Sequence, residues 1–182
     1  MDELEVYPLQ NDCSVLGRQL IDSVRAKRLP YADHSGSKAA VFEVLGNIGR
    51  GRGFQVFHGP CSGLSTDGCE FLLDLIWYSE TGGIEMGAEC EWMGADDVYY
   101  DFRKLVYVKS TLKILVYWVS RDVDDGEGVR QRIERYLEQY SRHAAGEQYL
   151  FVEFGRRNDD RCYSYIVPEK GAVSEVSLCR LI

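Results

Sequence analysis

The sequence predicts one α/β domain with a mixed central β-sheet flanked by helices. Apolar segments of strand length alternate with amphipathic segments of helical period, and some strand pairs are separated by a short turn whereas others are separated by a helix. Hairpins give antiparallel pairs and helical crossovers give parallel pairs, so the sheet should be mixed. The chain has 182 residues, 45% hydrophobic and 27% charged, which is an ordinary globular composition. We therefore expect a single domain over residues 1–182.

Two helices and a short strand are expected first. Apolar side chains recur at helical spacing over residues 15–28, and a second helix should begin near Ser37. This second helix should end within the segment 46–53, GNIGRGRG, because glycine is unfavourable inside a helix. Residues 54–57 follow as a short strand.

A hairpin is expected in the middle of the chain. The segment 70–78 is apolar on both faces, which is typical of a central strand. A Thr-Gly-Gly turn at 81–83 leads to a returning strand over 84–92. A helix over 97–108 and an apolar strand over 113–119 should follow.

The C-terminal third predicts one more helix and two more strands. After the polar segment 122–127, apolar residues from Val129 to Tyr140 recur at helical spacing. Strands are expected over 148–154 and 162–167, joined by a polar turn. These elements should complete the sheet.

The net charge excludes nucleic-acid binding by overall attraction. The chain has 21 Lys and Arg against 29 Asp and Glu, which gives −8 with neutral histidines. A protein of this charge does not attract a polyanion as a whole. Nucleic acid would have to bind at a local site, and a protein partner is the alternative.

The N-terminal segment predicts no targeting signal. MDELEVYPLQ lacks a basic region followed by an apolar one, and no apolar run approaches the length of a membrane-spanning helix. We therefore expect a cytoplasmic protein without a membrane partner. The six cysteines include no C-x-x-C pair and are expected to be free thiols.

The chemistry of the chain is expected on the central hairpin. Asp74 lies among apolar neighbours, where an ionised carboxylate needs a partner or a cation. The two-residue period of a strand puts Glu89 and Glu91 on one face, about 7 Å apart, and pairing in the hairpin would place Asp74 beside them. Converging carboxylates require neutralisation, either by Lys104 in the next helix or by Mg²⁺, which suits an all-oxygen site.

These residues resemble the active-site pattern of the PD-(D/E)XK nuclease superfamily. Asp74 in FLLDLIW and Glu89 in GAECEW match the two acids that bind Mg²⁺ or Mn²⁺ in that family. Glu91 occupies the usual lysine position, as in members with an E-x-E pattern. Lys104 in DFRKL resembles the migrated lysine of variant members, which helps to activate the attacking water.

The resemblance covers about residues 38–120 and implies the restriction-endonuclease-like fold. It further implies that Glu43, in the helix before the sheet, matches the auxiliary glutamate of many members. The proline that commonly precedes the first acid is missing here.

Structural roles can also account for these residues. Glu89 and Glu91 would be solvated on an exposed sheet face, and Lys104 would form an i,i+3 surface pair with Asp101. Glu43 would be an ordinary helix glutamate. Asp74 would be held by backbone N–H groups or by an arginine.

The glycine-rich segment offers a further, weaker site. A phosphate loop precedes the N-terminus of a helix, whereas this segment follows a helix, so it does not fit a phosphate loop. It is best interpreted as a helix terminator, with contact of Arg50 and Arg52 to a nucleic-acid backbone as the alternative.

Two functions follow from these patterns. The first is a metal-dependent phosphodiester hydrolase, a DNA or RNA nuclease, in which Asp74 and Glu89 bind the metal and Lys104 and Glu91 assist. The alternative is a non-catalytic acidic protein of the same fold that binds or inhibits a partner, which the net charge favours.

Overall fold

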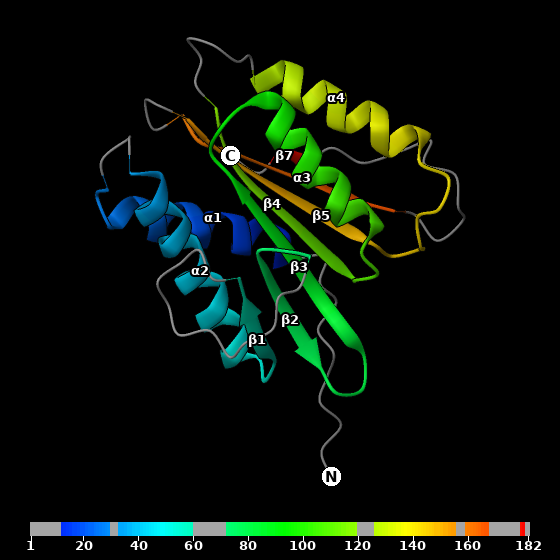
Figure 1. Ribbon diagram of the computed structural model, residues 1–182, viewed down its shortest axis with the longest axis horizontal. Coiled ribbons are helices and arrows are strands. Elements are labelled where there is room, and N and C mark those ends of the chain that lie inside the picture. The colour runs from blue at the N-terminus through cyan, green and yellow to red at the C-terminus, as the bar shows by residue number, and fades with distance from the viewer. Residues whose placement is uncertain are drawn as a thin grey trace.

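The fold is a seven-stranded β-sheet with two helices on each face (Figure 1). We describe it from a computed structural model that covers residues 12–29, 33–59, 72–119, 126–155, 159–167 and 179–180. The helices are α1 (Asp12–Ala26), α2 (His34–Gly51), α3 (Ala95–Tyr107) and α4 (Gly126–Gln139). The strands are β1 (Gln55–His58), β2 (Leu75–Ser79), β3 (Gly83–Glu91), β4 (Leu112–Val119), β5 (Gln148–Gly155), β6 (Arg161–Ile166) and β7 (Cys179–Arg180).

The strands lie in the sheet in the order in which they occur in the chain. β1, β2 and β3 pair antiparallel, β3, β4 and β5 pair parallel, and β5, β6 and β7 pair antiparallel. The two parallel connections cross over through α3 and α4 and advance in the same direction. Crossovers of the same hand therefore put both helices on one face, and α1 and α2 cover the other (Figure 1). The predicted mixed α/β fold is confirmed.

The core has two layers because the central strands are buried on both faces. On β4, Ile114 and Val116 pack toward α1 and α2. The alternate residues Leu115 and Tyr117 pack toward α3 and α4. This double burial explains why β4 is a continuous apolar run in the sequence instead of alternating with polar residues.

The first hairpin strand is shorter than predicted. β2 begins at Leu75, so Asp74 lies immediately before the strand and not within it. Glu70 and Phe71, which begin the predicted strand, lie outside the described residues. β2 also lies second from the edge of the sheet and not at its centre. Strand β7 was not predicted.

Helix α2 continues through two of the four glycines that were expected to end it. It ends at Gly51, followed by Arg52 as its cap and by Gly53 with a φ of +85°. The reason lies in the packing of Trp77 from β2. Its indole N–H donates to the carbonyl of Leu45 over 3.1 Å, and its ring occupies the space that a Cβ at Gly49 would need.

Alanine substitutions at Gly46 and Gly49 should have opposite effects on stability. At Gly49 the new methyl group meets the buried indole, so the variant should lose about 1–3 kcal/mol of unfolding free energy. At Gly46 the methyl group meets only the flexible end of Arg50, so the better helix propensity should stabilise by up to about 1 kcal/mol. Urea unfolding of both variants measures this, and equal effects would contradict the packing explanation.

Among the described residues, no helix is long and apolar enough to cross a bilayer.

Candidate active site

Two acids lie near each other at the open end of the β2–β3 hairpin, and the charge of Asp74 acts on Glu89. Leu75 pairs with Ala88 in this ladder, which places Asp74 opposite Glu89. Asp74 lies before the first paired residue of β2, so its side chain does not follow the alternation of the strand. Asp74 also accepts a 2.9 Å hydrogen bond at Oδ2 from the backbone N–H of Cys90. The ladder register thus places the two residues close together in the chain fold, while their side chains contact lysines from different helices.

Each of these acids contacts its own lysine. Lys38 of α2 places Nζ 2.8 Å from Asp74 Oδ2. Lys104 of α3 places Nζ 2.8 Å from Glu89 Oε1 and 2.8 Å from Asp101 Oδ1. We call these three acids and two lysines the acid–lysine cluster. It joins both faces of the sheet, since α2 and α3 lie on opposite sides.

Glu89 is the most deeply buried member of the cluster, with a residue exposure of 1%. Burial raises the pKa of Glu89 from 4.5 to about 9, the nearby charge of Asp74 adds to the increase, and the contact with Lys104 opposes it. Within the described part of the chain, Glu89 Oε2 is buried and has no hydrogen-bond partner. A buried carboxylate oxygen of this kind is costly unless something binds it.

Lys104 connects the sheet to α3. Burial acts to lower its pKa, but contacts with Asp101 and Glu89 outweigh burial and raise it. The lysine is therefore charged at neutral pH. The i,i+3 pair with Asp101 that the sequence suggests is present, and the same ammonium also reaches back to the strand.

Glu91 holds the turn between β3 and α3. Its Oε1 accepts hydrogen bonds of 2.6 Å from the backbone N–H groups of Trp92 and Met93. Burial raises the pKa of Glu91 although both hydrogen bonds act to lower it. Glu91 therefore positions the start of the helix that carries Lys104.

Glu43 lies apart from the carboxylates of the hairpin. Its exposed side chain forms an ion pair with Lys27, the residue directly after α1. The structure therefore does not place Glu43 where an auxiliary acid would act on Asp74 or Glu89, and the contact made by α2 comes from Lys38.

The two arginines of the glycine-rich segment lie at the far end of α2. Arg50 is twelve residues from Lys38, or roughly 18 Å along a helix, and it donates to Asn47 Oδ1 over 3.1 Å. The guanidinium carbon of Arg52 lies 5.7 Å from the centre of the Trp77 ring. The structure does not bring either arginine to the acid–lysine cluster.

Sequence reasoning missed Lys38. Its Nζ lies 5.7 Å from the centre of the Phe42 ring one turn later in α2. Nothing in the local sequence separates Lys38 from a solvated helix lysine, because its contact with Asp74 depends on how α2 packs against the sheet. The sequence offered only an indirect signal. Asp74 needs a cationic partner, and the helix that precedes the hairpin contains lysine.

The donor set suits a hard cation. Asp74 and Glu89 offer only oxygen, and Glu89 Oε2 lacks a hydrogen-bond partner among the described residues. The same residues contain no cluster of three or more His, Cys, Asp or Glu side chains arranged to hold a metal ion. Two carboxylates nevertheless fit Mg²⁺, which commonly takes one or two protein carboxylates and fills its remaining positions with water and substrate oxygens.

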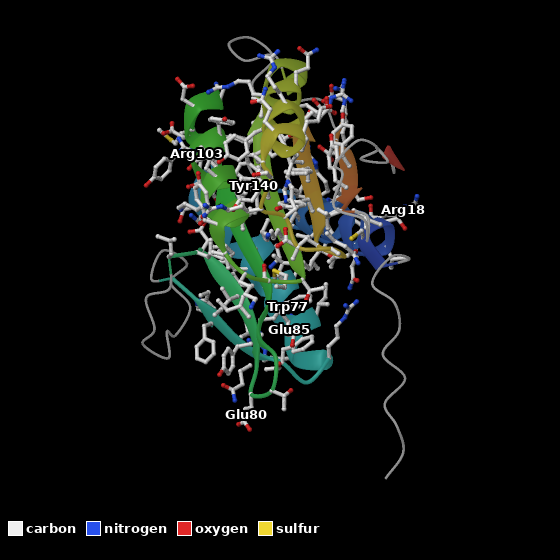
Figure 2. All side chains as sticks on the ribbon, turned by 90° about the vertical axis from the view of Figure 1, so that its right-hand side faces the viewer. Arg18, Trp77, Glu80, Glu85, Arg103 and Tyr140 are labelled. Carbon is white, nitrogen blue, oxygen red and sulfur yellow. The ribbon has the colours of Figure 1, made fainter. Side chains whose placement is uncertain are left out.

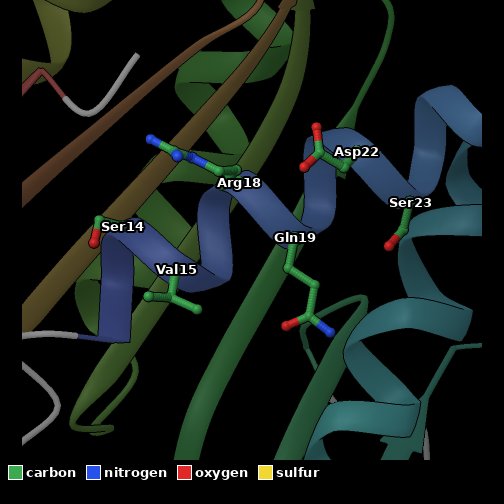
Figure 3. A pocket seen from close by; sticks show the side chains of 6 residues that line it. All are labelled: Ser14, Val15, Arg18, Gln19, Asp22 and Ser23. Atoms are coloured by element: carbon green, nitrogen blue, oxygen red, sulfur yellow. The ribbon is translucent and has the colours of Figure 1, made fainter.

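The described residues also form an open hollow along α1, away from this cluster. It has a volume of about 540 Å³ and is lined by Ser14, Val15, Arg18, Gln19, Asp22 and Ser23. Figure 3 shows these side chains projecting from successive turns of one helix. The hollow contains no member of the acid–lysine cluster.

Comparisons with known proteins leave the family open. No protein-family model and no curated protein matches the sequence. The chain is similar to the crystal structure of the central domain of yeast acetyl-CoA carboxylase, with a TM-score of 0.46 and 11% identity. That alignment covers 100% of this chain and 32% of the carboxylase chain, so this chain spans about a third of that protein's length.

Proposed function

We propose that this protein is a metal-dependent phosphodiester hydrolase that cleaves nucleic acid. The observation that carries the proposal is that Lys104 contacts Glu89 and that the charge of Asp74 acts on the same glutamate at one end of the hairpin. The three residues come from separate segments of the chain and occur in the order that resembles the PD-(D/E)XK pattern. The restriction-endonuclease-like fold is part of the same proposal.

Asp74 and Glu89 would hold Mg²⁺ or Mn²⁺. When bound, such an ion lowers the pKa of a water ligand and neutralises charge on the phosphate. Each acid now contacts a lysine, so cation binding competes with Lys38 and Lys104 for the same oxygens. Among the described residues, a lysine contacts Oε1 of Glu89 and none contacts its buried Oε2.

Lys104 would orient the attacking water. Its raised pKa keeps the ammonium charged, so it acts as a hydrogen-bond donor and not as a base. Asp101 fixes the ammonium from within the same helix. Positioning of this kind, together with charge stabilisation near the phosphate, is the usual source of large rate effects in phosphoryl transfer.

A second function has support from a specific observation. Asp74 and Glu89 are each paired with a lysine of the same chain, and the protein carries a net charge of −8. A self-neutralised cluster in an acidic protein also fits a non-catalytic protein that binds or inhibits a partner.

Cleavage assays on purified variants distinguish these functions. Wild-type protein should cleave single- or double-stranded DNA or RNA in Mn²⁺ and not in EDTA. Asp74→Asn and Lys104→Ala should each reduce the rate by about a hundredfold or more, because the first removes a ligand of the cation and the second removes a positive charge near the phosphate. Glu85→Gln is the matched control, since Glu85 lies on β3 with Glu89 but accepts a hydrogen bond from Ser79.

Thermal melting gives a readout that does not depend on turnover. Millimolar Mn²⁺ should raise the melting temperature of wild type by mass action and leave Asp74→Asn unchanged. No cleavage of any substrate combined with no melting shift would rule out the hydrolase and favour the partner-binding protein.

A further inference from the structure

Exposed tyrosines and an arginine form a stripe along α3. Tyr100 and Tyr107 are 64% and 58% exposed, and Arg103 is also exposed. Their spacing of three and then four residues places all three on one face of the helix. Large apolar rings left in solvent on one helix face indicate a surface that meets a ligand.

The stripe continues onto the neighbouring helix. The hydroxyl of Tyr107 lies 2.8 Å from that of Tyr136 on α4, and the Tyr107 ring packs edge-on against Tyr140, directly after α4. The rings of Tyr136 and Tyr140 stack with centres 6.0 Å apart. Figure 2 shows Arg103 and Tyr140 on this side of the molecule and Arg18 on the other. We call the surface of Tyr100, Arg103, Tyr107, Tyr136 and Tyr140 the tyrosine–arginine face.

This face begins at the acid–lysine cluster. Lys104 Nζ lies 5.8 Å from the centre of the Tyr100 ring and 2.8 Å from Glu89 Oε1. A ligand lying over Tyr100 would therefore be adjacent to the carboxylates of the candidate site.

The second half of α3 and the residues after it are basic, although Asp96 and Asp97 lie in the first turn of the same helix. From Tyr100 to Lys109 the chain contains three bases, Arg103, Lys104 and Lys109, and one acid, Asp101. That acid is buried and paired with Lys104. An acidic protein thus presents a basic, tyrosine-lined segment next to its candidate site.

We propose that the tyrosine–arginine face binds single-stranded nucleic acid and leads the strand to the site, an inference that rests on the proposed hydrolase function. Unpaired bases stack on exposed aromatic rings, whereas bases within a duplex are already stacked on each other. Tyr100 and Tyr107 lie roughly 10.5 Å apart along the helix axis. At ~3.4 Å per stacked nucleotide, that distance spans about three nucleotides. Arg103, which lies between the two tyrosines, could then contact a phosphate of the strand between the stacked bases.

A protein partner is the competing occupant, because tyrosine and arginine are also enriched at protein interfaces. Two observations favour nucleic acid. The local excess of bases complements a polyanion, and the stripe is continuous with the lysine that would contact a scissile phosphate.

Fluorescence anisotropy in EDTA tests the proposal without cleavage. The probes are labelled oligo-dT, oligo-U and a DNA duplex of equal length. Wild type should bind the single strands more tightly than the duplex. Tyr100→Ala and Tyr107→Ala should each weaken single-strand binding by about 5- to 150-fold, while Tyr100→Phe, which keeps the ring, should retain affinity.

The charged residue has its own test. Arg103→Ala should reduce the slope of log affinity against log salt by about 0.7. Arg18→Ala on α1 is the matched control and should leave both affinity and slope unchanged. Melting temperatures confirm that each variant is folded.

The outcomes separate this proposal from the hydrolase function. Equal losses for Arg103→Ala and Arg18→Ala, or wild-type affinity in both tyrosine variants, would overturn the nucleic-acid face. Binding of none of the three probes would overturn it as well and point to a protein partner. Tyrosine-dependent single-strand binding without Mn²⁺-dependent cleavage would support the face and remove the hydrolase.

Discussion

Replacing Glu89 by glutamine should make the metal-free protein more stable than wild type at pH 9, with the advantage shrinking toward pH 5. Burial raises the pKa of Glu89 from 4.5 to about 9, so the folded state holds a proton that the unfolded state releases. Across that interval the folded state binds more protons, and the stability of wild type therefore falls as the pH rises. The stabilisation that comes from protonated Glu89 is fully present below pH 4.5, and it is lost as the pH rises to about 9. Glutamine carries no titrating proton.

The difference should reach several kcal/mol, since each unit of pKa shift corresponds to about 1.4 kcal/mol. Urea unfolding in EDTA at pH 5, 7 and 9 measures it, and only the difference between wild type and variant is used because other groups titrate in this range. Glu85→Gln, on the same strand, should follow the wild-type curve. A wild-type stability that declines no more steeply than that of Glu89→Gln would show that Glu89 titrates normally.

A buried acid that destabilises its own fold fits a functional site. Natural proteins commonly retain such strain where activity requires it. Lys104 and Lys38 reduce the repulsion between Asp74 and Glu89 but leave Glu89 Oε2 without a hydrogen-bond partner among the described residues.

The local patterns of the sequence were sufficient to predict most elements. Helical spacing located α3 within two residues of its start and one of its end, and the continuous apolar run located β4 within one residue. These patterns work because burial on one helix stripe or on both faces of a strand leaves a period in the sequence. The predicted start of β2 was less accurate. The residues at 72–74 continue the apolar pattern of a strand, but they do not pair with a neighbouring strand.

The candidate site was predictable where hairpin geometry determines it. The turn predicts that Asp74 and the end of the returning strand lie close together, but the turn register alone would place Asp74 opposite Ala88. A register shift between Trp77 and Tyr78 moves it opposite Glu89, and no pattern in the sequence reveals that shift. Lys38 could not be placed from the sequence, because its position depends on tertiary packing of α2. The tyrosine–arginine face was also missed. The helical period from Val129 to Tyr140 predicts that Tyr136 and Tyr140 face inward, and both do pack against the core, but each is also partly exposed.

Lys113 shows a further limit of pattern reasoning. Its apolar surroundings on β4 predict a buried strand, and the lysine is indeed buried, with a fully covered side chain. Its Nζ lies 2.9 Å from Glu147 Oε2 and donates to the hydroxyl of Tyr149 over 3.2 Å. His143 lies 3.4 Å from the same oxygen of Glu147, and its Nε2 donates to the Leu137 carbonyl at the end of α4. The partners of this buried charge come from the segment around β5, which no local pattern in β4 reveals.

Removing this lysine should be among the most destabilising changes in the protein. Lys113→Ala leaves Glu147 without the lysine that contacts it at 2.9 Å, and breaking a buried pair from one side costs about 3–5 kcal/mol. The pKa of Glu147 is lowered, since contacts with His143 and Lys113 outweigh the opposing effect of burial. The carboxylate therefore stabilises the fold above pH 4.5, and this contribution disappears as the pH falls below that value. Urea unfolding at pH 7 should thus show a larger loss for Lys113→Ala than unfolding at pH 3.

Two further variants separate the charge from the packing. Lys113→Met combined with Glu147→Leu removes both partners and fills the space with apolar atoms, so it should recover most of the lost stability. Lys109→Ala, at an exposed lysine just after α3, should change stability by less than about 0.5 kcal/mol. If Lys113→Ala lost no more than Lys109→Ala at pH 7, the pair with Glu147 would not stabilise the junction of β4 and β5. The double variant could instead lose as much unfolding free energy as Lys113→Ala. In that case the packing of the lysine stem, and not the pair of charges, would stabilise the fold.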